Sequence, residues 1–184
     1  MNTFFGTKIN STSIFTDKGR RLVVTLVKAE PITVTQVKTQ GKDGYWAVQV
    51  KVGKKKREIR LSEEPTVKPG DQVKAAEVLK IGDTIKVGGI SKGRGFAGVI
   101  KRHGFHGGPK THGQSDRHRA PGSIGMRTTP GRVWKGHRMA GHYGVETVTV
   151  KKLKVLNFDE AQNILTVSGT VPGGRNGLLT LTKI

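Results

Sequence analysis

The sequence predicts a mainly β protein, in which a closed antiparallel β-barrel domain carries a long, mostly irregular basic extension inserted between its strands. Three observations predict this class. Short β-branched segments separated by Gly, Pro and Asp fill both ends of the chain, no segment keeps a helical period over three turns, and residues 91–144 have a different composition. A closed barrel is expected because it leaves no free edge among many short strands.

The first half of the chain has five candidate strands between turn signals: Arg21–Lys28, Pro31–Lys38, Tyr45–Val52, Val73–Leu79 and Thr84–Val87. Ala75–Leu79 is also the best short helical candidate. Strands resume in the last quarter of the chain with Val145–Val155, Asn163–Ser168 and Leu178–Thr182. We therefore assign residues 1–90 and 145–184 to one β-barrel domain.

The segment between these parts, residues 91–144, is rich in glycine, histidine and arginine. It contains 13 of the 26 glycines, all six histidines and 11 of the 33 Lys and Arg residues, but only one acid, Asp116. Its few apolar side chains bury too little area to offset the entropy lost when its backbone becomes ordered. We expect an extension that takes its shape against a partner and carries the function.

The formal net charge of +20 on 184 residues indicates a polyanionic partner. Lys and Arg brought to phosphates release condensed counterions, which favours nucleic acid. Charge alone also allows an anionic membrane surface, but no basic amphipathic helix supports it. The chain has no cysteine, no signal-peptide pattern and no apolar run of ~20 residues, so we expect a soluble intracellular protein without disulfides.

Gly93, Gly95 and Gly98 match the glycine spacing of a dinucleotide-binding loop. That site needs a helix opening within the pattern, and none is expected after Val99-Ile100 because glycines and a proline follow. A nicotinamide-dependent dehydrogenase is therefore the weaker alternative. We expect these glycines to let the backbone lie close to another backbone.

The histidines suggest a metal site, but no cysteine, helical i, i+4 histidine pair or carboxylate partner accompanies them. Ser115, Asp116 and His118 lie too near one another in the sequence to form a hydrolytic triad. We predict no catalytic residue, no metal ligand and no cofactor.

Spaced basic residues with Gly and Pro hinges favour a segment that threads among many phosphates. Phe105, Trp134 and Tyr143 are candidates for stacking on unpaired bases, and packing within the protein is an equal alternative for each. A free RNA chaperone or nucleoid protein would use the same charge, so this class stays open at this point.

Several motifs resemble one family. Ser91–Gly98, His118–Gly125, Thr129–Gly136 and Met139–Gly144 occur in the order found in bacterial ribosomal protein L3 of the large subunit, and flanking segments agree over nearly the whole chain. The resemblance implies a barrel with an extension through the rRNA toward the peptidyl transferase centre. It also implies early assembly on the 3′ part of the large rRNA.

The resemblance implies that Gly122–Gly131 forms the innermost tip, with Met126, Arg127 and Thr128 nearest the RNA centre. Many bacterial members carry a methylated glutamine at the position of Thr128, so that modification is expected to be absent here. The region around Lys54–Pro65 also looks shorter than in the family.

The expected partners are 23S-type rRNA and neighbouring large-subunit proteins in the cytoplasm, with no membrane and no homo-oligomer. The predicted rRNA-binding residues, from both lines of argument, are Lys92, Arg94, Gly95, Lys101, Arg102, His103, Lys110, His112, Arg117, His118, Arg119, Ser123, Met126, Arg127, Thr128, Arg132, Trp134, Lys135 and Arg138.

Overall fold

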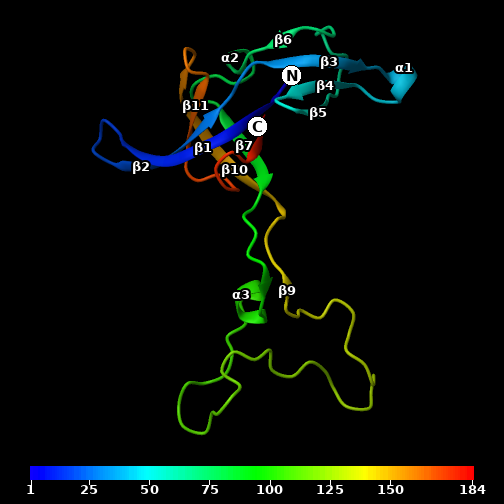
Figure 1. Ribbon diagram of the computed structural model, residues 1–184, viewed down its shortest axis with the longest axis vertical. Helices are drawn as coiled ribbons and strands as arrows, with labels where there is room; N and C mark the ends of the chain where they lie inside the picture. Colours follow the sequence, from blue (N-terminus) through cyan, green and yellow to red (C-terminus); the bar gives the residue numbers. More distant parts are fainter. The chain divides into compact units, whose positions relative to one another are not determined.

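The computed structural model describes residues 1–184 and divides the chain into two compact units (Figure 1). Unit 1 consists of Met1–Ser91 and Thr147–Ile184, and unit 2 is Lys92–Glu146. Strands dominate unit 1, and only three helices occur in the chain, each of four or five residues. The prediction of a mainly β protein is therefore confirmed.

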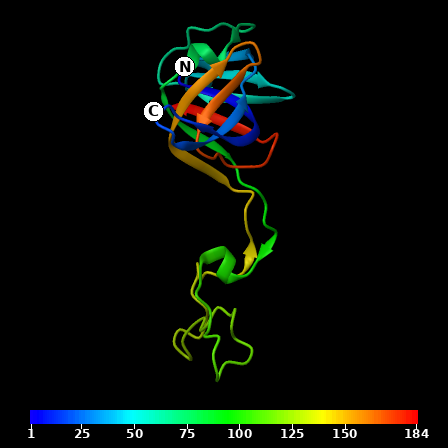
Figure 2. The same ribbon diagram turned by 90° about the vertical axis from the view of Figure 1, so that its left-hand side faces the viewer.

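Unit 1 is built around six antiparallel strands in the order β1-β12-β7-β10-β11-β2, which form a closed barrel because β2 pairs again with β1. Figure 2 shows these strands wrapping around one interior. Their bounds are β1 (Thr3–Phe15), β2 (Arg21–Lys28), β7 (Thr84–Ile90), β10 (Thr147–Asp159), β11 (Ile164–Ser168) and β12 (Leu178–Lys183).

The alternation of residues along each strand decides which side chains face the interior. In β12, Leu179 and Leu181 are fully buried while Thr180 and Thr182 are on the other face, and in β7 Ile85 and Val87 are buried while Lys86 is exposed. This period of two is what a strand with one apolar face requires. Each fully buried aliphatic side chain stabilises the fold by roughly 1.5–3 kcal/mol.

A second, open sheet has the strand order β5-β4-β3-β6. Its strands are β3 (Ile32–Lys38), β4 (Ala47–Val52), β5 (Lys55–Arg60) and β6 (Gln72–Val73), accompanied by one-turn helices α1 (Gln40–Asp43) and α2 (Ala75–Val78). Val34, Val48 and Ile59 of this sheet belong to the same buried cluster as Phe4 and Leu181 of the closed sheet. Unit 1 therefore has a single hydrophobic core.

Unit 2 contains only β8 (Phe96–Ala97), α3 (Val99–His103) and β9 (Gly141–His142) as regular elements. The sequence predicted that no helix follows Val99-Ile100, and this prediction is wrong. Val99–His103 forms one turn that begins after Gly98 and ends at Gly104, where a φ of 74° is accessible to glycine.

Two further strand expectations need correction. Val73–Leu79 is not a strand, because β6 ends at Val73 and α2 follows. There the Glu77 carboxylate accepts a hydrogen bond of 3.4 Å from the backbone N–H of Lys74. The sequence pattern also omitted β1 and β5. None of the three short helices could span a lipid bilayer.

Candidate nucleic-acid interface

Unit 2 has almost no interior of its own. Ala97 and Val99 are the only buried residues among its 55 positions. Ala97 belongs to a short antiparallel ribbon, in which it pairs with Gly141 and Phe96 pairs with His142, and Val99 follows this ribbon in the sequence. The ribbon continues by backbone hydrogen bonds of 2.9 Å from Arg94 N to Tyr143 O and from Tyr143 N to Gly95 O.

Hydrogen bonds connect helix α3 to the segment before β9, at the backbone carbonyl of Met139. The Arg102 guanidinium donates to the Met139 carbonyl at 2.9 Å, and the His103 Nε2–H donates to the same oxygen at 3.0 Å. A Cβ at Gly141 would collide with the Arg102 guanidinium, so glycine allows this contact. These two side chains therefore hold unit 2 together.

A loop between residues 108 and 118 is closed where two backbones approach each other. Gly108 N donates to His118 O at 2.9 Å, and His118 Nδ1–H donates to Gly108 O at 3.2 Å. A Cβ at Gly107 would collide with His118 O, and one at Gly108 would lie 2.9 Å from Arg117 O. The two glycines are required for this close approach.

Residues 121–136 present their side chains to solvent, with the partial exception of Pro130. Met126 is 78 % exposed and Trp134 is 58 % exposed, and the Arg132 guanidinium lies 5.6 Å from the centroid of the Trp134 ring. Few contacts fix the segment, among them Ser123 Oγ donating to Gly125 O at 3.0 Å. An exposed Met, Trp and Arg are available for an external partner.

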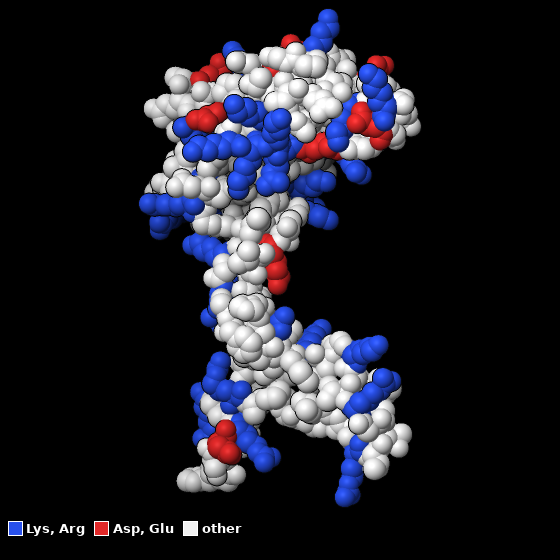
Figure 3. Space-filling model, turned by 45° about the vertical axis from the view of Figure 1, so that its right-hand side comes forward, with Lys and Arg blue, Asp and Glu red and all other residues white.

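The eleven Lys and Arg residues of unit 2 form no ion pair. Figure 3 shows the basic side chains of this unit in several groups spread along it rather than in one block. In unit 1, by contrast, acids pair with bases: Glu58 lies 2.7 Å from Lys38 and Asp83 lies 2.8 Å from Lys183. The unneutralised cations of unit 2 require counterions or an anionic partner.

Of the nineteen residues predicted to bind rRNA, sixteen are exposed. The three half-buried ones are Arg102, His103 and His118, the same side chains that hydrogen-bond to backbone carbonyls within unit 2. The geometry therefore separates the predicted set into many side chains free to meet a ligand and three that organise the unit.

The glycine pattern has a different basis from the one expected. A Cβ at Gly93 would meet the Val145 side chain at 3.1 Å, and apart from the adjacent residues nothing lies within 4 Å of a Cβ at Gly95 or Gly98. The φ of 63° at Gly95 explains glycine there. Within unit 2, a Cβ would come closer than 3 Å to a backbone atom at Gly107, Gly108 and Gly144, and at Gly144 it would also lie 3.0 Å from Gly93 Cα.

No group of three His, Cys, Asp or Glu side chains is placed so that it could hold a metal ion. His118, which the sequence excludes from a triad with Ser115 and Asp116, donates its Nδ1–H to the Gly108 carbonyl.

The aromatic residues of unit 2 differ in accessibility. Tyr143 is half-buried with Arg94 stacked 4.6 Å from its ring centroid, and Phe105 is half-buried 6.2 Å from the His103 ring. Trp134 remains exposed. Phe96, which the sequence reasoning did not select, is 73 % exposed and contacts His142 edge to face at 6.2 Å. No sequence pattern singles it out, because its two-residue strand exists only through pairing with Gly141 and His142.

Sequence comparison with known proteins finds similar chains over nearly the whole length. The family model of ribosomal protein L3 matches residues 9–166. The large ribosomal subunit protein uL3 of Dehalococcoides mccartyi is 48 % identical, covering 97 % of this chain and 96 % of the relative. The corresponding protein of Herpetosiphon aurantiacus is 47 % identical over 100 % and 96 %, and that of Pseudomonas syringae 44 % over 96 % and 93 %.

Proposed function

The chain belongs to the ribosomal protein L3 family, and we propose that it holds large-subunit rRNA mainly through unit 2, residues 92–146. It is a structural constituent of the large ribosomal subunit and not an enzyme. It acts in the cytoplasm as part of the ribosome, where it binds rRNA and other ribosomal proteins.

The observation that carries the proposal is the combination of eleven unpaired cations with two buried residues in unit 2. A segment with so little interior gains its order from outside contacts. Neutralising its cations with phosphates releases counterions, which stabilises the bound state. RNA supplies both the contacts and the charge.

The finer part of the proposal concerns where the RNA is met. We assign residues 91–144 to an rRNA-threading extension and residues 1–90 with 145–184 to the globular barrel domain. The sequence motifs support placing Gly122–Gly131 toward the peptidyl transferase region, with Met126, Arg127 and Thr128 nearest it. Peptide-bond chemistry then belongs to the RNA, and the protein braces it.

Assembly on the 3′ part of the large rRNA belongs to the same proposal. The resemblance of the sequence motifs supports this part, and the exposure of Met126, Arg127 and Thr128 supports only that these side chains have no packing role inside the chain. Their contacts are therefore free to be made with RNA.

Gradient sedimentation of lysates from cells that express the tagged chain tests whether it is a constituent of the large ribosomal subunit. We expect stoichiometric amounts in large subunits after a high-salt wash. A chain found only in the free fractions or spread along unrelated RNA would instead identify an RNA chaperone. Cross-linking residues 91–144 to the RNA of purified subunits tests the finer placement, which fails if no adduct maps near the peptidyl transferase region.

A further inference from the structure

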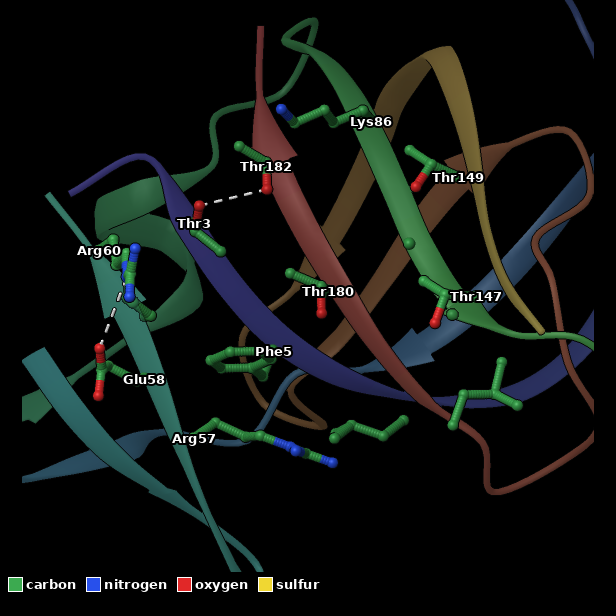
Figure 4. A pocket seen from close by; sticks show the side chains of 15 residues that line it. Thr3, Phe5, Arg57, Glu58, Arg60, Lys86, Thr147, Thr149, Thr180 and Thr182 are labelled. Carbon is green, nitrogen blue, oxygen red and sulfur yellow. Dashed lines mark hydrogen bonds and ion pairs between the residues drawn. The ribbon is translucent and has the colours of Figure 1, made fainter. Parts of the chain in front are cut away.

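Unit 1 contains a cavity of about 690 Å³ between β5 and the closed sheet (Figure 4). On the closed sheet it is lined by the outward-facing residues of four neighbouring strands. Phe5, Thr180, Gly88 and Thr149 are cross-strand partners in one row, and Thr3, Thr182 and Lys86 form the next row. Arg57 and Arg60 come from β5.

The hydroxyl groups of this surface are available to a ligand. Thr3 Oγ1 donates to Thr182 Oγ1 at 3.2 Å, but the hydroxyls of Thr147, Thr149 and Thr180 have no hydrogen-bond partner in the chain. A threonine hydroxyl both donates and accepts. It therefore suits a surface that offers oxygen acceptors as well as hydroxyl donors.

Gly88 lies between Thr149 and Thr180 on this surface, and no contact within the fold requires a glycine at this position. A Cβ there would make only ordinary contacts, 3.7 Å from Thr149 Oγ1 and 3.9 Å from Thr180 Cβ, and its φ is not positive. At the adjacent Gly89 a Cβ would lie 2.8 Å from Leu179 Cδ2, so there the core requires glycine. A glycine that weakens a strand without an internal cause marks the close approach of another molecule.

The charge of the cavity is positive. Arg57 and Lys86 are exposed and have no ion-pair partner, whereas the one acid, Glu58, is already bound to Lys38 at 2.7 Å. Arg60 is 3.9 Å from Glu58 and its guanidinium lies 4.7 Å from the Tyr45 ring centroid. Two free cations flanking unpaired hydroxyls favour an anion with hydroxyl groups.

We propose that this groove binds the sugar–phosphate backbone of an RNA segment, with Arg57 and Lys86 on phosphates and Thr147, Thr149 and Thr180 on phosphate and ribose oxygens. The inference rests on the proposed function and adds a second RNA contact, on unit 1. The only aromatic lining it, Phe5, is 6 % exposed, so bases have no ring to stack on and binding does not depend on RNA sequence.

A protein partner fits the surface less well. Protein interfaces centre on buried apolar or aromatic anchors, and Ile90 is the single large apolar side chain that is well exposed in the groove. Unpaired hydroxyls and cations around a glycine instead match contacts to a nucleic-acid backbone.

The absence of cysteine from the chain allows a direct test by site-specific cross-linking. Thr149→Cys, carrying an azidophenacyl group, is incorporated into large subunits and irradiated. We expect an RNase-sensitive rRNA adduct several-fold stronger than that from Ser62→Cys, an exposed position outside the groove. A protein adduct, or no excess over Ser62→Cys, overturns the proposal.

A second measurement uses full-length variants and a labelled single-stranded oligoribonucleotide. Replacing both Arg57 and Lys86 by Ala should make the log–log salt slope of binding shallower by about 1.4, the effect of two single-strand phosphates. Lys18 and Lys68, also exposed lysines of unit 1, give the matched control when both are replaced by Ala, and an equal change in the two variants would refute the assignment.

Filling the groove provides a third comparison. Gly88→Leu is expected to weaken the binding of the oligoribonucleotide. Gly41→Leu, at another glycine with open space and an ordinary φ, is expected to leave the binding unchanged. A failure of every variant and of the unmodified chain to enter large subunits would count against the proposed function. Normal entry without the rRNA adduct counts against the groove alone.

Discussion

At the residue scale, two glycines three positions apart show that the same letter has different causes. Gly95 has a φ of 63° and accepts the Tyr143 N–H in the β8–β9 ribbon, so its backbone conformation requires glycine. Gly98 has a φ of −67° and open space around its Cβ position, so an alanine fits. The spacing in the sequence could not separate these two cases because it contains no dihedral angle.

This difference predicts the outcome of substitution. A β-branched side chain at the φ of Gly95 costs about 1–2 kcal/mol, so Gly95→Val should lose a competition with the unmodified chain for entry into large subunits by roughly fivefold to thirtyfold. Lys92→Ala removes one cation of the eleven in unit 2 and should have a milder effect. Gly98→Ala is the control, and equal incorporation of Gly95→Val and Gly98→Ala would contradict the argument.

At the scale of elements, strands with strong β-branched alternation were predictable and strands held by their partners were not. β2 has the predicted bounds, Arg21–Lys28. The second half of β1 is polar and forms a strand because it pairs with β2 from Thr7–Lys28 to Phe15–Arg21. β5 reads Lys-Lys-Arg-Glu-Ile-Arg and buries only Ile59, so its strand structure depends on pairing with β4.

An ion pair between β3 and β5 gives the second sheet a dependence on pH. Lys38 Nζ lies 2.7 Å from both Glu58 Oε2 and the Tyr45 hydroxyl. The hydrogen bond from Lys38 lowers the pKa of Glu58 below its ordinary 4.5, and the bond to Glu58 raises the pKa of Lys38 above its ordinary 10.5. The charged forms of both groups are therefore stabilised by folding.

The directions of the two pKa shifts predict that the stabilisation by this ion pair is constant over a middle range of pH and falls on either side. The lowered pKa of Glu58 contributes stability that is fully present above about pH 4.5 and is lost as the pH falls through the folded-state pKa. The raised pKa of Lys38 contributes stability that is fully present below about pH 10.5 and is lost as the pH rises through the folded-state pKa. In urea unfolding, Lys38→Gln should therefore be less stable than the unmodified chain between these limits, with a difference that shrinks on either side. Lys51→Gln, on exposed β4 surface, is the control. A difference that does not change with pH would exclude this pair as its source.

At the scale of the whole molecule, composition predicted the unusual character of residues 91–144 because charge and glycine content decide whether a segment can form a core. The same reasoning from composition could predict the sixteen exposed candidate residues. The structural use of Arg102, His103 and His118 was not, because it depends on carbonyls of Met139 and Gly108 that only the folded backbone brings near. The groove beside β5 was missed because its threonines come from strands distant in sequence.

The same physical picture predicts how the full chain responds to RNA. With two buried residues in unit 2, we expect the backbone amides of residues 92–146 to exchange rapidly in the free protein at low salt and to become protected in the assembled subunit. The closed sheet of unit 1 should be protected in both states and is the internal control. Equal protection of unit 2 in the free and assembled chain would show that its order does not come from RNA.

The affinity for rRNA fragments should fall steeply with salt because counterion release supplies much of the binding free energy. The expected slope of log affinity against log salt is about −0.9 for each duplex phosphate neutralised and −0.7 for each single-strand phosphate. Since the cations of unit 2 are spaced and unpaired, replacing Arg127, Arg132 and Lys135 by Ala should make the slope shallower by about 2 to 3. Binding that is insensitive to salt, or a slope unchanged in the triple variant, would show that phosphate neutralisation is not what holds the RNA.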